Sequence, residues 1–197
     1  MDYFVSIISA QKQQAQDIAK LIMTAMSEDC CAYFYGERHT AEDFLLMLTE
    51  LVEMEHSQYS YRNTILALAD ERIAGIAVSY DGSLLHDLRT AFIAAAKHYF
   101  NRDFSQMDDE TEEGELYLDS FAVLPAFRKR GIGSQLLQAT VDKAQKLKLP
   151  CVGLLVDEQN PAAERLYLAN GFHLVNTSSW GGHRMKHLQT ASNVICV

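Results

Sequence analysis

One stretch in the second half of the chain restricts the fold more than any other, because it alternates strand, helix and strand patterns. Residues Glu115–Val123 and Cys151–Val156 are rich in apolar, β-favouring side chains. Between them, Gly133–Leu147 has apolar side chains at helical spacing. Two strands of one sheet that are joined by a crossover helix run parallel, with a right-handed connection. The sequence therefore predicts a βαβ unit here.

The other segments predict an α/β fold with a mixed, twisted sheet and helices on both faces. Two β-rich runs, Thr64–Ala69 and Ile73–Tyr80, are separated by a short polar turn, which favours an antiparallel hairpin. With 197 residues, 48% of them hydrophobic, the chain is long enough for one core, so a single domain over 1–197 is expected. The remaining elements expected are a strand at 3–8, helices near 15–26, 40–52, 84–100 and 161–169, and final strands at 172–176 and about 183–188.

Charge and cysteine usage exclude several classes of protein. The net charge of -9 repels nucleic acid and attracts cations. The four cysteines do not have the spacing of a zinc site or a disulfide framework, so no metal is expected. No apolar stretch approaches the length that spans a bilayer, and the first residues lack the basic region of a signal peptide. We therefore expect a cytoplasmic protein without a membrane partner.

The segment before the βαβ unit, about 84–114, is expected to be an insert. Its last part, 103–115, is strongly acidic and includes Asp108, Asp109, Glu110, Glu112 and Glu113. Dense charge of one sign resists burial, which favours a solvated loop. The functional alternative is an acidic rim that binds a cationic substrate.

The loop after Val123 has the composition of an anion site. Gly131 and Gly133 lack a Cβ, so the backbone can approach a bulky anion, and the N-terminus of the following helix adds positive potential. Residues 128–130 add three cationic side chains in an otherwise acidic chain. The phosphate-loop motif is absent and the third glycine of the dinucleotide fingerprint is missing, so neither ATP nor NAD is supported. The loop is therefore predicted to bind a pyrophosphate group.

Two motifs in this region resemble the GCN5-related N-acetyltransferase (GNAT) superfamily. Its first signature, Gln or Arg, two residues, Gly, one residue and Gly or Ala, is matched by Arg128, Gly131 and Gly133 directly after a predicted strand. The later run from Asn160 to Phe172 looks like the second signature of the superfamily. The resemblance covers about 115–172, and the N-terminal half adds only a compatible order of elements.

The resemblance implies a sheet that splays between its fourth and fifth strands, with the pantetheine arm of acetyl-CoA inserted between them. The arm would pair with the backbone of the fourth strand, and the loop would hold the pyrophosphate. For Asn160, the alternative to cofactor contact is a role as the N-cap of the next helix. The cofactor-binding residues implied are Phe121, Ala122, Val123, Arg128, Lys129, Arg130, Gly131, Ile132, Gly133, Ser134 and Asn160.

The resemblance also implies that Tyr167 is the general acid, because its phenol can protonate the departing thiolate. A half-buried tyrosine on a short helix is the structural alternative. Candidates for the general base are Glu115 and Asp119, which share one face of the predicted strand with Tyr117, and an exposed strand face is their alternative. The opposite face would carry Leu116, Leu118 and Ser120.

We therefore predict an acetyltransferase that moves the acetyl group of acetyl-CoA to the primary amine of a small, cationic acceptor. Transfer would proceed by direct attack of the amine, without a covalent acyl-enzyme. The alternatives are an enzyme that acetylates the N-terminus or a lysine of a protein, and a non-catalytic acyl-CoA-binding sensor. A monomer and a homodimer are equally compatible, and the apolar tail Val194–Val197 could pack against either a neighbour or its own domain.

Overall fold

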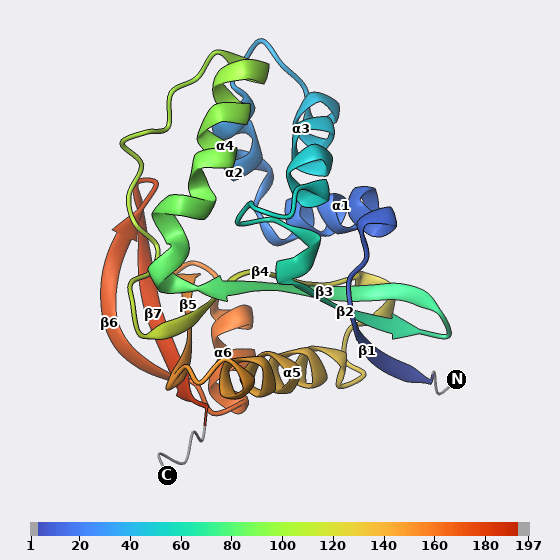
Figure 1. Ribbon diagram of the computed structural model, residues 1–197. Helices are drawn as coiled ribbons and strands as arrows, with labels where there is room; N and C mark the ends of the chain where they lie inside the picture. Colours follow the sequence, from blue (N-terminus) through green and yellow to red (C-terminus); the bar gives the residue numbers. More distant parts are fainter. Residues whose placement is uncertain (1–3, 193–197) are drawn as a thin grey trace.

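A computed structural model describes residues 4–192 of the chain. Its centre is a seven-stranded sheet with the strand order β1-β2-β3-β4-β5-β7-β6 (Figure 1). Strands β4 and β5 run parallel and every other neighbouring pair is antiparallel, which confirms the predicted mixed sheet and βαβ unit. The strands are β1 (Val5–Ser9), β2 (Thr64–Ala69), β3 (Arg72–Asp81), β4 (Glu115–Val123), β5 (Cys151–Asp157), β6 (His173–Trp180) and β7 (His183–Ala191).

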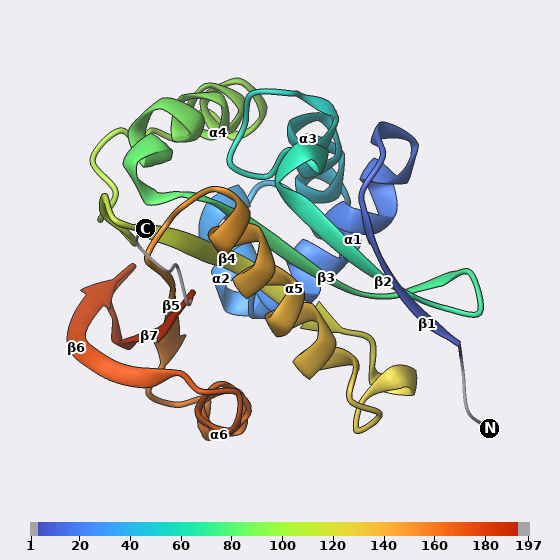
Figure 2. The same ribbon diagram turned by 60° about the horizontal axis from the view of Figure 1, so that its bottom comes forward.

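Helices lie on both faces of the sheet, as the sequence predicts. In Figure 1, α1 to α4 lie above the sheet, whereas α5 and α6 lie below it. In Figure 2, where this lower side is turned forward, α5 crosses in front of the central strands and α6 lies below β5. The helices are α1 (Ala15–Ala25), α2 (Glu28–Tyr35), α3 (Ala41–Glu53), α4 (Leu85–Phe100), α5 (Ile132–Lys146) and α6 (Pro161–Ala169).

The two faces of the sheet carry separate apolar cores. Above the sheet, the core is aromatic, with the ring of Phe34 centred 5.0 Å from that of Phe92 and 6.0 Å from that of Phe44. Below it, aliphatic side chains of α5 pack on β4 and β5, with Leu116 and Leu136 fully buried. Burial of such side chains stabilises the fold by about 1.5–3 kcal/mol each.

The helix starts show which local signals the sequence carries. Thr40 caps α3: its hydroxyl accepts a hydrogen bond from the Asp43 amide at 3.2 Å, and the Asp43 carboxylate accepts one from the Thr40 amide at 2.9 Å. Helix α2 was not predicted, although Ser27 caps it by accepting a hydrogen bond from the Cys30 amide at 3.0 Å. With eight residues, α2 is too short for a clear apolar period.

The last two strands are longer than predicted, because Gly181 and Gly182 form a tight turn between them. Both glycines have positive φ angles, 57° and 83°, which suits a two-residue hairpin turn. Strand β6 therefore runs on through Trp180, and β7 reaches Ala191. The tail Val194–Val197 and the expected strand start at Tyr3 lie outside the described residues.

Candidate active site

Strands β4 and β5 separate soon after they begin to pair. Their ladder joins Glu115 to Cys151, Leu116 to Val152 and Tyr117 to Gly153. Beyond these three pairs, β4 continues to Val123 and β5 to Asp157 without pairing each other. The expected splay between the fourth and fifth strands is therefore present.

The backbone groups of Phe121 and Val123 face this gap. The Leu124 amide donates to the carbonyl oxygen of Ala74 on β3 at 2.8 Å, and the two residues lie opposite each other in the antiparallel register. Bonded and non-bonded pairs alternate along such a ladder, so Ala122 also bonds to β3, whereas Phe121 and Val123 direct their N–H and C=O groups away from it. The edge of β4 that faces β5 therefore offers backbone groups at these two positions that are not used by the sheet, although the Val123 carbonyl oxygen accepts a hydrogen bond from Arg128.

The loop after β4 turns sharply into α5. Lys129 and Gly131 have φ angles of 60° and 75°, and Gly131 is the N-cap of α5 without a side-chain capping bond. The first N–H groups of a helix have no partner within the helix, and the helix dipole makes this end positive. The arrangement suits an anion, as the sequence predicts for Arg128 to Ser134.

Two residues of the loop have distinct positions. The Arg128 guanidinium donates through Nε to the Val123 carbonyl oxygen at 2.9 Å, which ties the loop to the open edge of β4. A Cβ on Gly131 would meet no atom within 4 Å, whereas one on Gly133 would lie 3.5 Å from Leu166 and 3.6 Å from Phe121. The space in front of Gly131 is therefore open, while Gly133 packs between β4 and α6.

Tyr167 lies on α6 beside the same gap. Its ring is centred 6.0 Å from that of Phe121 and 5.7 Å from that of Phe172, and only 8% of the residue is exposed. Burial raises the pKa of the Tyr167 phenol well above its ordinary value, so the hydroxyl keeps its proton at neutral pH. The described residues provide no hydrogen-bond partner for that hydroxyl.

Asn160 caps α6, which is the structural alternative considered for it. Its Oδ1 accepts a hydrogen bond from the Ala163 amide at 3.1 Å, and Pro161 occupies the first helical position. The side-chain oxygen of Asn160 is therefore engaged within α6.

A β-bulge interrupts β4 at Asp119. Val78 on β3 lies opposite Ser120 and Ser79 lies opposite Leu118, so Asp119 has no partner on β3. Leu118 belongs to the core below the sheet, and beyond the bulge so does Phe121, while Ala122 joins the core above. The prediction that Ser120 shares a face with Leu118 is therefore wrong, because the extra residue reverses the alternation.

Lys143 on α5 supports the sheet at this bulge. Its Nζ donates to the carbonyl oxygen of Ser79 at 2.6 Å, to the Ser79 hydroxyl at 3.1 Å and to the carbonyl oxygen of Asn63 at 3.0 Å. Burial lowers the pKa of the Lys143 ammonium to about 8. All three ammonium protons have acceptors, so the lysine fixes β3 where its register with β4 shifts.

Asp119 lies deep in the molecule, above the sheet, and keeps some accessible surface. Its carboxylate accepts hydrogen bonds from the Ser120 hydroxyl at 2.7 Å and from Gln58 Nε2 at 3.4 Å. Burial raises the pKa of the Asp119 carboxyl to about 7, and the negative charge of Glu110 adds to the effect. The group is therefore poised to exchange a proton near neutral pH.

The acidic run 103–115 is not simply a solvated loop, because Glu110 is buried. Its carboxylate pairs with Arg89 on α4, accepts a hydrogen bond from the Tyr80 hydroxyl at 3.2 Å and accepts another from Trp180 Nε1 at 3.3 Å. Arg89 also donates to Asp109 Oδ1 and to the Asp108 carbonyl oxygen, each at 3.0 Å. A buried guanidinium thus anchors the run against α4, which the sequence pattern did not reveal.

Glu115 lies at the closed end of the splay and is only 1% exposed. Its carboxylate accepts a hydrogen bond from Gln189 Nε2 at 2.8 Å and one from the Thr111 hydroxyl at 2.6 Å, and it pairs with His187 Nε2 at 2.9 Å. Burial pushes the pKa of Glu115 upward, but these hydrogen bonds, that from His187 foremost, outweigh it and hold the pKa below its ordinary value. Glu115 therefore ties β4 to β7 and the insert.

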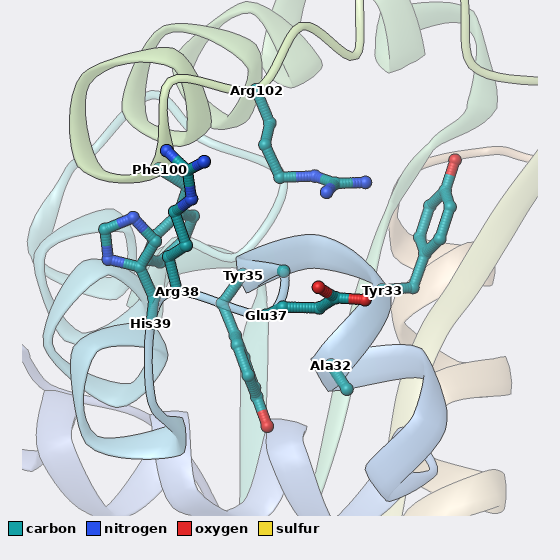
Figure 3. A pocket seen from close by; sticks show the side chains of 9 residues that line it. Ala32, Tyr33, Tyr35, Glu37, Arg38, His39, Phe100 and Arg102 are labelled. Atoms are coloured by element: carbon teal, nitrogen blue, oxygen red, sulfur yellow. The ribbon is translucent and has the colours of Figure 1, made fainter.

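Two cavities open above the sheet. The smaller, of about 210 Å³, lies between the insert and the β6–β7 turn, where Asp108 and Trp180 contribute to its wall. The larger, of about 720 Å³, lies between α2, the loop that leads from α2 to α3, and the end of α4 (Figure 3). Tyr33 lines both. Sequence reasoning named Glu110 within a possible acidic rim but missed Trp180 and Gln58 as neighbours of the site, because only tertiary contacts bring them to it.

The comparisons with known proteins agree with this geometry. Residues 21–172, more than half of the chain, match the Acetyltransferase (GNAT) family. A crystal structure of an acetyltransferase superposes with a TM-score of 0.80 at 29% identity, covering 95% of this chain and 100% of that one. An N-acetyltransferase from Staphylococcus aureus Mu50 gives 0.78 at 21% identity, covering 94% and 100%. The NatC complex bound to Gag peptide and CoA gives 0.58 at 16% identity, covering 95% and 98%.

The chain belongs to the GNAT family of acetyltransferases and is therefore an acyltransferase of the N-acetyltransferase type. Enzymes of this family use acetyl-CoA. No curated protein matches the chain. Within residues 4–192, no three His, Cys, Asp or Glu side chains are grouped to hold a metal ion, and no helix is both long and apolar enough to cross a bilayer.

Proposed function

We propose that the protein transfers the acetyl group of acetyl-CoA to the primary amine of a small acceptor that arrives as an ammonium cation. The observation that carries this proposal is the early end of the β4–β5 ladder, which leaves the backbone groups of Phe121 and Val123 facing a gap. The gap has the uncapped N-terminus of α5 at one end and Tyr167 at its side.

The gap suits the extended arm of the coenzyme. An amide-bearing chain can hydrogen-bond to the open edge of β4 as a further strand would, through the N–H and C=O groups of Phe121 and the N–H group of Val123. The amides of Gly131 to Ser134 and the side chains of residues 128–130 then hold the pyrophosphate. When bound, the coenzyme supplies an activated acyl group as a thioester.

Asp119 is the proposed general base. An amine attacks only as the free base, and a carboxyl with a pKa of about 7 can accept the ammonium proton near neutral pH. The bulge supports this role, because it directs Asp119 out of the ladder on the face that carries both cavities. Glu115 is the weaker candidate, since three hydrogen-bonding partners occupy its carboxylate at the closed end of the splay.

Tyr167 is the proposed general acid. As the amine nitrogen forms its bond to the acyl carbon, the carbon–sulfur bond breaks, and the electron pair of that bond leaves with sulfur. The Tyr167 phenol gives its proton to the thiolate and recovers one from solvent, while Asp119 holds the proton of the amine. Negative charge that develops on the acyl oxygen is stabilised by a fixed backbone N–H of β4. The products are the N-acetylated amine and the free thiol.

The cavity beside the insert supports a small acceptor over a protein chain. It is about 210 Å³ in volume and has Asp108 and the ring of Trp180 in its wall, both of which attract an ammonium group. Trp180 links the cavity to Glu110, whose charge acts on Asp119. A cation is thus drawn toward the proposed base.

The test is release of coenzyme A thiol when the protein is mixed with acetyl-CoA and a panel of primary amines. We expect thiol release with at least one amine, and mass spectrometry of that amine should show one added acetyl group. Tight acetyl-CoA binding without release from any amine or peptide would support the sensor instead. Thiol release only with peptides would support a protein acetyltransferase.

A further inference from the structure

The larger cavity carries two guanidinium groups. Arg38 and Arg102 line it together with Glu37 and the aromatic rings of Tyr33 and Tyr35. Four of the nine lining residues come from the loop 36–39 between α2 and α3. Figure 3 shows Arg102 reaching across the opening toward Tyr33, with the Glu37 carboxylate below it. The cavity is open, and its volume of about 720 Å³ is ample for a small molecule.

Neither guanidinium is neutralised by the protein. Within residues 4–192, neither Arg38 nor Arg102 forms an ion pair with a carboxylate, although the chain has 26 acidic residues against 17 lysines and arginines. Arg89, by contrast, pairs with both Asp109 and Glu110. Two unpaired arginines against the single carboxylate of Glu37 leave this cavity with a positive charge in an otherwise acidic protein.

Arg102 is also held in a fixed orientation. Its guanidinium carbon lies 5.6 Å from the ring centre of Tyr33 and 5.4 Å from that of Phe104, so the cation is placed between two aromatic faces. Its Nε is buried without a hydrogen-bond partner. Gly36 makes room for the group, because a Cβ there would lie 2.9 Å from Nη1 of Arg102. A guanidinium fixed in this orientation, with its terminal nitrogens in the opening of the cavity (Figure 3), suits an oxyanion.

We infer that this cavity binds an anionic group, a carboxylate, carried by the acceptor itself. This inference rests on the proposed function, and it adds that the acceptor is zwitterionic, with its amine directed toward Asp119 and its carboxylate on Arg102. Tyr33 is the residue that connects the two ends, because it lines both the large cavity and the small one that leads to Trp180 and Glu110.

The two cavities differ in the charges on their walls. Arg38 and Arg102 line the larger cavity, and Asp108 lines the smaller one, where Trp180 bonds to the Glu110 carboxylate that pairs with Arg89. A diamine would place a cation against the two arginines, which costs affinity, whereas an ω-amino acid has an anion there. The planar fork of Arg102 matches a carboxylate through two parallel hydrogen bonds.

Binding can be tested without catalysis. Calorimetric titration with glutarate, a dicarboxylate without an amine, should show saturable binding to the wild-type protein. Arg102→Met keeps the aliphatic stem but removes the donors, and we expect it to weaken glutarate binding about ten- to a hundredfold. Arg62→Met, which removes an exposed guanidinium paired with Glu55, is the matched control and should bind as the wild type does. Equal binding to both variants, or none to the wild type, overturns the inference.

Kinetics then connect the site to the acceptor. With acetyl-CoA, ω-amino acids of increasing length should be compared with n-alkylamines of equal length, and kcat/KM should favour the amino acid about tenfold or more at one optimum length. Arg102→Met should abolish that preference while leaving kcat/KM for the alkylamine within about threefold. Arg102→Lys keeps the positive charge but lacks the planar fork, so this variant should show only part of the wild-type preference for the amino acid.

The two proposals fail separately. If no amine is acetylated but glutarate binding depends on Arg102, the anion site stands and the catalytic proposal falls. If amines are acetylated with no preference for a carboxylate, the catalytic proposal stands and the inference is overturned.

Discussion

Replacement of Asp119 by asparagine separates its proposed catalytic role from its effect on stability. The variant keeps the shape of the protonated carboxyl but cannot accept a proton from the amine. Loss of a general base typically lowers rates by about 10²–10⁴-fold, so we expect kcat/KM to fall by at least about a hundredfold. In the wild type, kcat/KM should rise with pH through the Asp119 pKa of about 7, and this rise should be missing in the variant.

The same group makes the wild-type protein less stable as pH rises. Folded Asp119 keeps its proton up to a pH of about 7, whereas in the unfolded chain the carboxyl ionises near its ordinary pKa of 3.8. The folded state binds more protons between these values, so the free energy of unfolding falls as pH rises through this window. The difference between these two pKa values corresponds to at most about 4 kcal/mol of unfolding free energy, because solvent that reaches the side chain screens part of the penalty.

The assay is urea denaturation of both proteins at pH 5 and pH 8. Hydrogen bonds lost with the carboxylate affect both measurements alike, so the change in the difference isolates ionisation. Two pH units lie between pH 5 and the folded pKa. On going from pH 5 to pH 8, the free energy of unfolding of the variant should therefore rise by at most about 3 kcal/mol relative to that of the wild type. The exposed substitution Asp142→Asn is the control and should show no such change. A difference that stays constant with pH would refute the elevated pKa.

Three further substitutions test the remaining roles. Tyr167→Phe should lower kcat about a hundredfold while the Kd for acetyl-CoA, measured by calorimetry, stays within about threefold; unchanged turnover would remove the phenol from the mechanism. Gly131→Leu should weaken acetyl-CoA binding at least about tenfold, because the side chain enters the open space at the loop, whereas Gly114→Leu, at a similarly positive φ of 107°, should bind normally. Glu115→Gln should lower the free energy of unfolding by about 2 kcal/mol in urea yet keep kcat within about threefold, and a hundredfold loss would reinstate it as the base.

The sequence predicted the elements that carry long or well-capped patterns. The strand Glu115–Val123 and the helix from Pro161 to Ala169 have the predicted bounds, because alternating apolar residues in one and Pro161 with Gly171 in the other mark their limits. The glycine loop that follows β4 was likewise predicted from its own residues. These signals are local, so they can be recognised in the sequence without knowledge of the fold.

Features that depend on contacts between distant segments were not predictable. The bulge at Asp119 depends on the register between β3 and β4, and no residue pattern within β4 predicts it. Burial of Glu110 depends on Arg89, twenty-one residues away, and on Trp180, seventy residues away. The charge of the acidic run alone favours a solvent-exposed loop. Glu110 is buried instead, because the buried guanidinium of Arg89 compensates its charge.

The short ladder between β4 and β5 has a consequence for how the molecule coheres. Three residue pairs join the half of the sheet made by β1 to β4 to the half made by β5 to β7. A coenzyme arm bound along the open edge of β4 would join the two halves as a further strand would. Its binding would therefore also raise the free energy of unfolding. The midpoint temperature of thermal unfolding should then rise with the logarithm of the coenzyme concentration. The protein would also last longer before unfolding when acetyl-CoA is abundant.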